Sequence, residues 1–341
     1  MIRRPGGRPA VIEAPLDPGQ PIIDAHHHLY ERPGLRYLAQ DYAADLAACG
    51  HDIRATVFVQ ARAMYRTDGP ENMRPVGETE FAAGIGRGAT GPARICAGIV
   101  GFADLTLGEA VRPVLEAHVA AADGTTRQGG RFAGVRHVLA WDEDARLLNP
   151  AYPASAELMD TDAFRRGFAQ LAPLGLTFDA WLHFHQIPRL AALARAFPDT
   201  GIVLDHCGGI LGIAGYAGSR DKVFAEWALG IRDLATCPNV MVKLGGLGMA
   251  LTGFGFEKDE ARPGSMQLAA TWRAWMRTVI EAFGPARCMF ESNFPPDKVS
   301  YDYGTGWNAM KRVAEDASVD ERHDLFWRTA ARFYGLGHER S

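Results

Sequence analysis

The sequence feature that most constrains the fold is an alternation of short apolar runs with helical patterns. Within each run, apolar and β-branched residues are nearly continuous, which is typical of parallel strands buried on both faces. Between the runs, apolar residues recur with the period of an α-helix. The eight predicted strands are residues 22–28, 54–60, 94–101, 132–139, 176–185, 201–206, 239–244 and 287–292.

This alternation predicts an α/β protein built as a single (β/α)8 TIM barrel. The main alternative, a doubly wound open sheet, would carry a glycine-rich phosphate turn after its first strand. Here the first strand runs into His26, His27 and His28, and no G-x-x-x-x-G-K-[ST] phosphate loop occurs. We therefore expect residues 21–341 to form one barrel domain with C-terminal helices. Residues 1–20, rich in Pro, Gly and charge, are expected to form a tail or surface arm without a secretion signal.

Charge and cysteine content narrow the class of protein. With a formal net charge of −4 and a pI near 6.3, the chain offers no basic surface for nucleic acid or an anionic membrane. No apolar run approaches the ~20 residues of a membrane span. The five cysteines are odd in number, far apart and without a Cys-x-x-Cys pair, as expected for free thiols in a reducing cytoplasm. We expect a cytoplasmic protein acting on a small molecule; monomer and homo-oligomer both remain open.

The histidines mark the expected site, because barrel active sites lie at the carboxyl ends of strands. Seven of the eleven histidines fall on or at the end of a predicted strand. These seven are His26, His27, His28, His137, His183, His185 and His206. Side chains alternate along a strand, so Asp24, His26 and His28 are predicted to share one face. His26 and His28 could then hold one metal ion, the alternative being a surface histidine cluster.

Two further strands contribute histidines. His185 lies nearer the end of the fifth predicted strand than His183 and is the better candidate for a metal ligand or catalytic group. His183 is either a substrate-binding or ligand-supporting residue, or a core histidine. His206 ends the sixth strand and is predicted to face the barrel interior, with a purely structural histidine as the alternative.

Two cations are predicted to lie inside the barrel. Arg136 and Lys243 sit on the fourth and seventh strands, where a buried charge is costly unless it is paired or binds an anion. We expect both to bind an anionic substrate. For both residues the alternative is a structural ion pair, which for Lys243 would be with Asp205 or Glu291.

Weaker candidates follow the second strand and end the eighth. Gln60, Tyr65 and Arg66 are predicted to contact substrate, although solvated loop residues are the default there. Asn293 lies at the end of the eighth strand. Its amide is a poor base but can orient water or a carbonyl, or weakly ligate a metal.

Three motifs in this order resemble the amidohydrolase-2 group of the amidohydrolase superfamily. They are Asp24-Ala25-His26-His27-His28-Leu29, Asp205-His206-Cys207-Gly208-Gly209 and Arg287-Cys288-Met289-Phe290-Glu291-Ser292-Asn293-Phe294-Pro295. Such proteins are (β/α)8 barrels that include lactonases and zinc-dependent decarboxylases of aromatic or muconate-type acids. The resemblance spans residues 21–335 and implies a divalent metal cofactor, zinc in the family's usual pattern.

The resemblance also assigns roles to individual residues. It implies His26 and His28 as the metal pair of the first strand, and His185 or His183 as the ligand from the fifth. His206 corresponds to the further active-site histidine, a proton carrier or oxyanion stabiliser. Asn293 departs from the family, which has at this position an Asp that binds the metal and takes a proton from water. The missing carboxylate weakens the expectation of a bound metal.

These observations predict a hydrolase that uses water to open a small carboxylated lactone or related ester, with or without a metal. Because Asn293 cannot accept a proton, His206 is the predicted base. Glu291 is expected to pair with Lys243, and the direction of Asp297 cannot be read from the sequence. The alternatives are a zinc-dependent non-oxidative decarboxylase and a catalytically reduced barrel that only binds a ligand.

Overall fold

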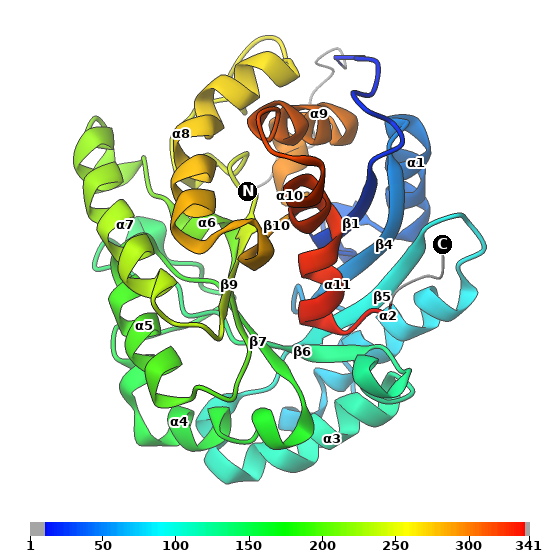
Figure 1. Cartoon of the computed structure of the whole chain (residues 1–341). Helices are drawn as coiled ribbons and strands as arrows, with labels where there is room; N and C mark the ends of the chain where they lie inside the picture. Colours follow the sequence, from blue (N-terminus) through cyan, green and yellow to red (C-terminus); the bar gives the residue numbers. More distant parts are fainter. Residues whose placement is uncertain (1–10, 338–341) are drawn as a thin grey trace.

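The computed structural model describes residues 11–337 and confirms the predicted (β/α)8 TIM barrel (Figure 1). Eight parallel strands form one sheet in the order β1-β4-β5-β6-β7-β8-β9-β10. The sheet closes between its first and last strands, where His28 N donates to Phe294 O at 2.8 Å and Asn293 N donates to His26 O at 2.9 Å. The strands are β1 Pro21–His27, β4 Asp52–Val59, β5 Arg94–Gly101, β6 Phe132–Arg136, β7 Thr177–Ala180, β8 Ile202–Leu204, β9 Val240–Leu244 and β10 Cys288–Phe290.

Most helices surround the strands and bury their apolar residues against the outside of the barrel. The N-terminus of α4 begins as the sequence predicts, because the side chain of Thr161 accepts a hydrogen bond from Phe164 N and caps the helix. None of the helices within residues 11–337 combines the length and apolarity needed to cross a membrane. The helices are α1 Ala39–Cys49, α2 Val76–Gly88, α3 Arg112–Ala121, α4 Asp162–Phe168, α5 Ile187–Ala196, α6 His206–Gly209, α7 Arg220–Ala235, α8 Ser265–Phe283, α9 Tyr303–Val313, α10 Val319–His323 and α11 Thr329–Tyr334.

A second apolar cluster fills the inside of the barrel. It combines small and β-branched residues of the strands, such as Ile23, Val57 and Val203, with Phe333 and Tyr334 of α11. In Figure 1 this helix, drawn in red, lies in front of the strands. The last helix of the described chain therefore plugs the barrel, and the opposite end, where the strands finish, is left for chemistry.

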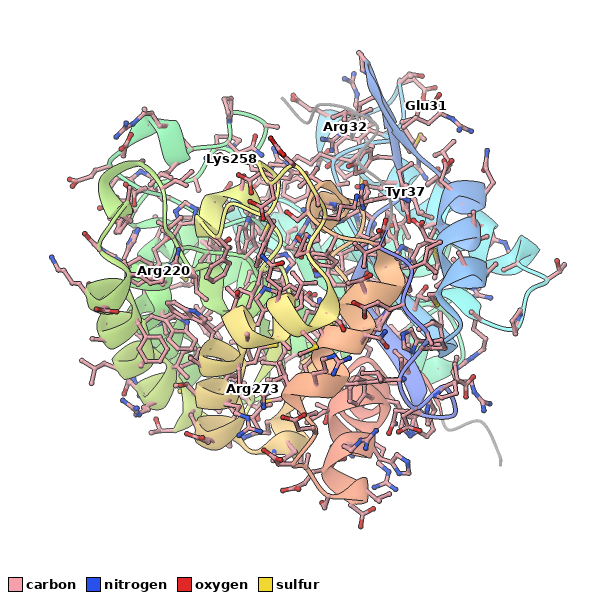
Figure 2. All side chains as sticks on the ribbon, turned by 90° about the horizontal axis from the view of Figure 1, so that it is seen from above. Glu31, Arg32, Tyr37, Arg220, Lys258 and Arg273 are labelled. Carbon is pink, nitrogen blue, oxygen red and sulfur yellow. The ribbon has the colours of Figure 1, made fainter. Side chains whose placement is uncertain are left out.

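The loops after the strands build the open end. The hairpin of β2 (Tyr30–Arg32) and β3 (Leu35–Tyr37) follows β1, and a long loop follows β9. Figure 2 shows Glu31, Arg32 and Lys258 of these two segments along the same edge of the molecule.

The N-terminal arm is described only from residue 11 onward, and residues 1–10 lie outside the described part. Residues 11–20 run over the surface beside α8 and α9. Leu16 N donates to the side chain of Asn308 at 2.7 Å, and Lys311 Nζ donates to the carbonyls of Leu16 and Asp17 at 2.8 Å. These bonds hold the segment against the barrel domain.

Two predicted strands differ from the observed ones in ways that matter for the site. The fifth was predicted over residues 176–185, but β7 ends at Ala180 and the chain turns into a short 3-10 helix at Phe184–Gln186. His183 and His185 therefore lie in the loop after the strand. Within β1, the register against β4 shifts between Asp24 and His27, so side-chain alternation is interrupted there.

Candidate active site

The shift in β1 separates Asp24 from the two histidines predicted to share its face. Asp24 points toward the surrounding helices, where it accepts from Tyr42 Oη at 2.7 Å, Tyr303 Oη at 2.8 Å and Ser292 Oγ at 2.6 Å. The prediction of one common face for Asp24, His26 and His28 was wrong. Asp24 instead ties β1 to α1, α9 and the end of β10.

His26 and His28 do converge inside the barrel. Their Nε2 atoms lie 3.2 Å apart, and both residues are buried. His28 Nδ1 lies 2.7 Å from Val59 O, and a carbonyl oxygen only accepts. The proton of neutral His28 is therefore on Nδ1, which leaves its Nε2 lone pair directed at His26.

The proton of His26 can occupy either ring nitrogen. Its Nδ1 lies 3.0 Å from Lys243 Nζ, which donates, and 3.1 Å from Glu291 Oε2, which forms no hydrogen bond within residues 11–337. With the proton on Nε2, His26 donates to His28 and accepts from Lys243. With the proton on Nδ1, the two Nε2 lone pairs face each other.

The imidazoles of His26 and His28 remain neutral near neutral pH. Burial lowers the pKa of His26 well below its usual value, and the positive charge of Lys243 lowers it further. Burial and the guanidinium of Arg136 do the same to the pKa of His28. Both side chains can therefore act as hydrogen-bonding groups or metal ligands over the physiological pH range.

Lys243 forms the buried ion pair that the sequence left open as its alternative role. Its Nζ donates to Asp179 Oδ2 at 2.6 Å and lies 3.2 Å from Asp205 Oδ1, with all three side chains fully buried. Tyr334 Oη of α11 donates to the same oxygen of Asp179 at 2.8 Å. Lys243 is thus neutralised by two carboxylates beneath His26.

Arg136 lies above this layer, beside the histidine pair. Its Nη1 is 3.3 Å from His26 Nε2 and 3.7 Å from Asp205 Oδ2, and its Nη2 donates to Gln60 O at 2.5 Å. Its buried Nε has no hydrogen-bond partner among residues 11–337. Gln60 is buried, with its amide bonded to Arg136 O and Arg62 N, so it positions Arg136.

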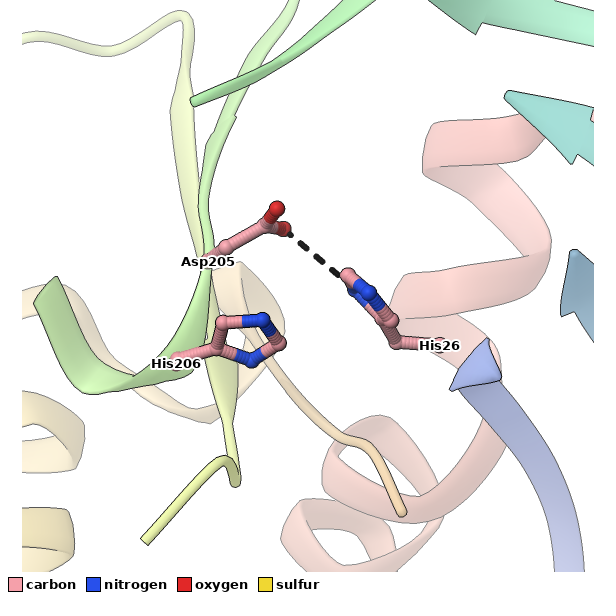
Figure 3. Close-up of side chains that lie close together, drawn as sticks. All are labelled: His26, Asp205 and His206. Atoms are coloured by element: carbon pink, nitrogen blue, oxygen red, sulfur yellow. Dashed lines mark ion pairs between the residues drawn. The ribbon is translucent and has the colours of Figure 1, made fainter. Parts of the chain in front are cut away.

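His206 is clamped by a carboxylate. Its Nδ1 lies 2.7 Å from Glu291 Oε1, and its backbone N donates to the same oxygen at 3.1 Å. The sequence paired Glu291 with Lys243, but the structure gives its closest contact to His206. This bond places the proton of neutral His206 on Nδ1 and leaves Nε2 as a free base. Figure 3 shows His206 beside His26, whose ring centroid is 4.6 Å away, with Asp205 above them.

Asn293 is buried in a separate network in the loop after β10. Its Nδ2 donates to Asp297 Oδ1 at 2.9 Å, while Tyr301 Oη and Gly248 N donate to Asp297 Oδ2 at 2.6 and 3.0 Å. Burial raises the pKa of Asp297 to about 7. The structure thus settles the direction of Asp297, which points into this network.

The histidines after β7 belong to a second group. His185 Nε2 lies 3.0 Å from Asp142 Oδ2, and His183 Nδ1 lies 3.2 Å from Trp141 O. Within residues 11–337, His185 does not share a three-residue coordinating group with His26 and His28; it shares one with Asp142 and His183. The predicted metal set of His26, His28 and His185 is therefore not brought together.

The remaining two predicted site residues, Tyr65 and Arg66, lie in the loop that follows β4. Arg66 forms an exposed ion pair with Glu80, so its charge is already partnered. The hydroxyl of Tyr65 is buried and lacks a hydrogen-bond partner in the described chain. Of the two, Tyr65 has the free polar group that a ligand could use.

Sequence reasoning missed Asp142 and Tyr334. Asp142 follows the end of β6 closely, and that strand-end position was a usable signal. Tyr334 lies on the last helix, and nothing in its neighbourhood along the chain indicates that it reaches Asp179 inside the barrel.

The donor set of the barrel fits a divalent ion. Zinc–nitrogen bonds of 2.0–2.1 Å place two ligands of a tetrahedral ion about 3.3 Å apart, close to the 3.2 Å between the Nε2 atoms of His26 and His28. Asp205 and His206 form a second coordinating group with His26. The nearby cations Arg136 and Lys243 oppose a bound cation, which lowers its affinity.

An eight-stranded parallel barrel with histidines and carboxylates inside its carboxyl end defines the class of this chain. The sequence profile described as "Amidohydrolase" matches residues 23–336, and the chain belongs to this family. It is an amidohydrolase-superfamily hydrolase.

Two curated relatives and one solved structure are similar over almost their full lengths. The chain is 32% identical over 335 residues to the uncharacterized protein y4mH of Sinorhizobium fredii, covering 92% of this chain and 98% of the relative. It is 30% identical over 339 residues to an L-fucono-1,5-lactonase of Burkholderia multivorans, covering 92% and 96%. A zinc-bound amidohydrolase structure from Burkholderia multivorans aligns with a TM-score of 0.69 and 26% identity, covering 93% and 99%.

Proposed function

We propose that this hydrolase opens a small, polar lactone by adding water to its acyl carbon. The observation that carries the proposal is the Glu291–His206 pair, in which a buried carboxylate fixes the imidazole at Nδ1 and frees Nε2 beside His26. A carboxylate–histidine pair of this kind is a standard means of removing a proton from water near neutral pH. The similarity to an L-fucono-1,5-lactonase supports the same reaction class.

The residues divide the reaction between them. His206 Nε2 takes a proton as the water oxygen bonds to the acyl carbon, and Glu291 stabilises the imidazolium that forms. Arg136 stabilises the negative charge that develops on the acyl oxygen. His206 then returns the proton to the ring oxygen as the carbon–oxygen bond breaks, and a hydroxy acid is released.

A divalent metal, with zinc the best match, is the cofactor that we propose for His26 and His28. When bound there, it supplies Lewis-acid polarisation of the acyl oxygen. Asn293 would not contribute a charge to such an ion, because its side chain is a neutral amide, and its nitrogen donates to Asp297.

Unmet polar groups near Arg136 support a polar, anionic substrate. Within the described chain, Arg62 Nε, Tyr65 Oη, Glu78 Oε2 and Arg136 Nε are buried without a hydrogen-bond partner. Buried polar groups are normally satisfied, so a ligand with hydroxyl and carboxylate groups would complete them. Arg136 remains the proposed anion-binding residue, while the paired charge of Lys243 acts through His26 and Asp205.

The test is a panel of sugar lactones and carboxylated lactones, assayed by proton release with a pH indicator. We expect saturable turnover by the wild type and none by His206→Asn, which should keep its fold and its metal content. Release of carbon dioxide from a muconate-type acid, with no lactone turned over, would identify a decarboxylase instead. Absence of any turnover across both sets would favour a ligand-binding barrel.

A further inference from the structure

A second cluster of metal-binding side chains lies at the open end of the barrel. Asp142 comes from the loop after β6, and His183 and His185 come from the loop after β7, its neighbour in the sheet. One ligand atom from each residue lies within 4.8 Å of the other two. Asp142 and His183 are each about 3% exposed, so these side chains are held in place by the surrounding protein and are not a chance cluster on the surface.

The hydrogen bond of His183 prepares it as a ligand. Its Nδ1 lies 3.2 Å from Trp141 O, which only accepts, so the proton of neutral His183 is on Nδ1. Metal-binding histidines commonly donate one ring N–H to a carbonyl or carboxylate in this way, which fixes the tautomer. With the proton on Nδ1, the Nε2 lone pair of this buried ring is the atom that His183 can offer to an ion shared with Asp142 and His185.

Asp142 and His185 form the opposite edge of the cluster. His185 Nε2 lies 3.0 Å from Asp142 Oδ2, near the roughly 3.3 Å expected between two ligands with zinc bonds of 2.0–2.2 Å. Tyr216 Oη donates to the same carboxylate at 2.8 Å, and Asp144 N donates to Oδ1 at 2.8 Å. These donors orient Asp142 as supporting groups orient metal-bound carboxylates.

The two loops are held in place independently of any ion. The amide of Gln186 accepts from Trp141 N at 3.0 Å and donates to Leu139 O at 2.9 Å, while Leu139 N donates to Trp181 O at 2.8 Å. The backbone on both sides of the cluster is therefore fixed. A cation binding there would meet a preformed site.

We propose that Asp142, His183 and His185 form a divalent-cation site of the zinc type, separate from the His26–His28 pair. The ion replaces the proton shared by His185 and Asp142, takes the free Nε2 of His183 as its third ligand, and leaves a fourth position for water. It ties the loop after β6 to the loop after β7. The proposal does not depend on lactone hydrolysis.

The test is zinc binding to the full, tag-free chain after removal of metal, measured by competition with a chromophoric chelator. We expect His185→Asn and Asp142→Asn to lower the affinity of one zinc equivalent by more than about 100-fold, because even loss of an outer-shell partner costs 10- to 100-fold. The double variant His26→Asn/His28→Asn should keep that equivalent. His323→Asn on α10, outside both groups, is the matched control.

Two further measurements keep the test decisive if a variant folds poorly. Cobalt(II) added to the wild type should give the visible absorption of tetrahedral coordination, and the double variant at His26 and His28 should retain it. Zinc should raise the melting temperature of the His26→Asn/His28→Asn variant but not of the same variant that also carries His185→Asn. Unchanged zinc affinity in the Asp142 and His185 variants, or loss of all zinc in the His26/His28 double variant, would overturn the proposal.

Discussion

Replacing Glu291 with Gln tests the proton acceptor most directly. The substitution keeps the shape of the side chain and an oxygen that can accept from His206 Nδ1, but it removes the negative charge. In the wild type this bond is 2.7 Å long, and Glu291 is fully buried, so solvent does not screen the charge. The imidazolium formed during the reaction therefore loses its charged partner.

The size of the effect follows from the buried charges. Three carboxylates, Asp179, Asp205 and Glu291, face two permanent cations, Arg136 and Lys243, which leaves one negative charge in excess to stabilise an imidazolium. A hydrogen bond to a charged group contributes about 1.5–3 kcal/mol. At ~1.4 kcal/mol per decade, kcat/KM should fall by about 10- to 150-fold, with KM little changed.

The assay is proton release from the best lactone of the panel, followed as a function of pH. The acidic limb of the kcat/KM profile should move to lower pH in Glu291→Gln, because the imidazolium is no longer favoured. Glu116→Gln, which removes an exposed partner of Arg112 on α3, is the matched control and should behave as wild type. Full activity with an unshifted profile in Glu291→Gln would refute the role of His206 as base.

Three further perturbations probe the surrounding structure. Lys243→Met should destabilise the fold by about 3–5 kcal/mol, because it leaves Asp179 and Asp205 buried without their cation. A urea unfolding midpoint equal to that of the wild type would show that this ion pair is dispensable for stability. Asn293→Asp replaces a donor to Asp297 by a second carboxylate, so it should lower the free energy of unfolding by about 1–3 kcal/mol at pH 8 and by less at pH 5. If the variant instead becomes more stable only when zinc is added, position 293 lies at the metal. Burial raises the pKa of Glu78 from 4.5 to about 7, so the folded state binds the extra proton and the contribution of Glu78 to stability is lost as pH rises from about 5 to 7. Glu78→Gln should therefore gain up to about 3 kcal/mol on wild type between pH 5 and pH 8 in urea unfolding, and parallel pH curves would contradict this.

The barrel could be predicted from the sequence because its signal is local. Strands buried on both faces need continuous apolar residues, and Arg94–Gly101 was predicted with its observed bounds. The convergence of His26 with His206 followed from their positions at strand ends. These inferences need only the order of residues along one strand.

The pairing of charges could not be predicted, because it depends on depth and register between strands. Lys243 could reach Glu291 or Asp205 from the sequence alone, yet it lies against Asp179 and Asp205, and Glu291 turns to His206. The early end of β7 likewise removed His185 from the face on which alternation had placed it. Because the strand alternation stops at Ala180, His185 contacts Asp142 instead of the histidines inside the barrel.

The contact between α11 and Asp179 has a consequence for the order in which the protein is made. Tyr334 both fills the bore of the barrel and hydrogen-bonds to Asp179, so the buried charges are completed only after α11, which follows every barrel strand in the chain, has been synthesised. A nascent chain that stops before residue 329 would expose an unplugged apolar interior beneath an unfinished carboxylate layer. The barrel can therefore be completed only once α11 has been synthesised. Chains truncated before α11 should be degraded by proteases as unfolded protein.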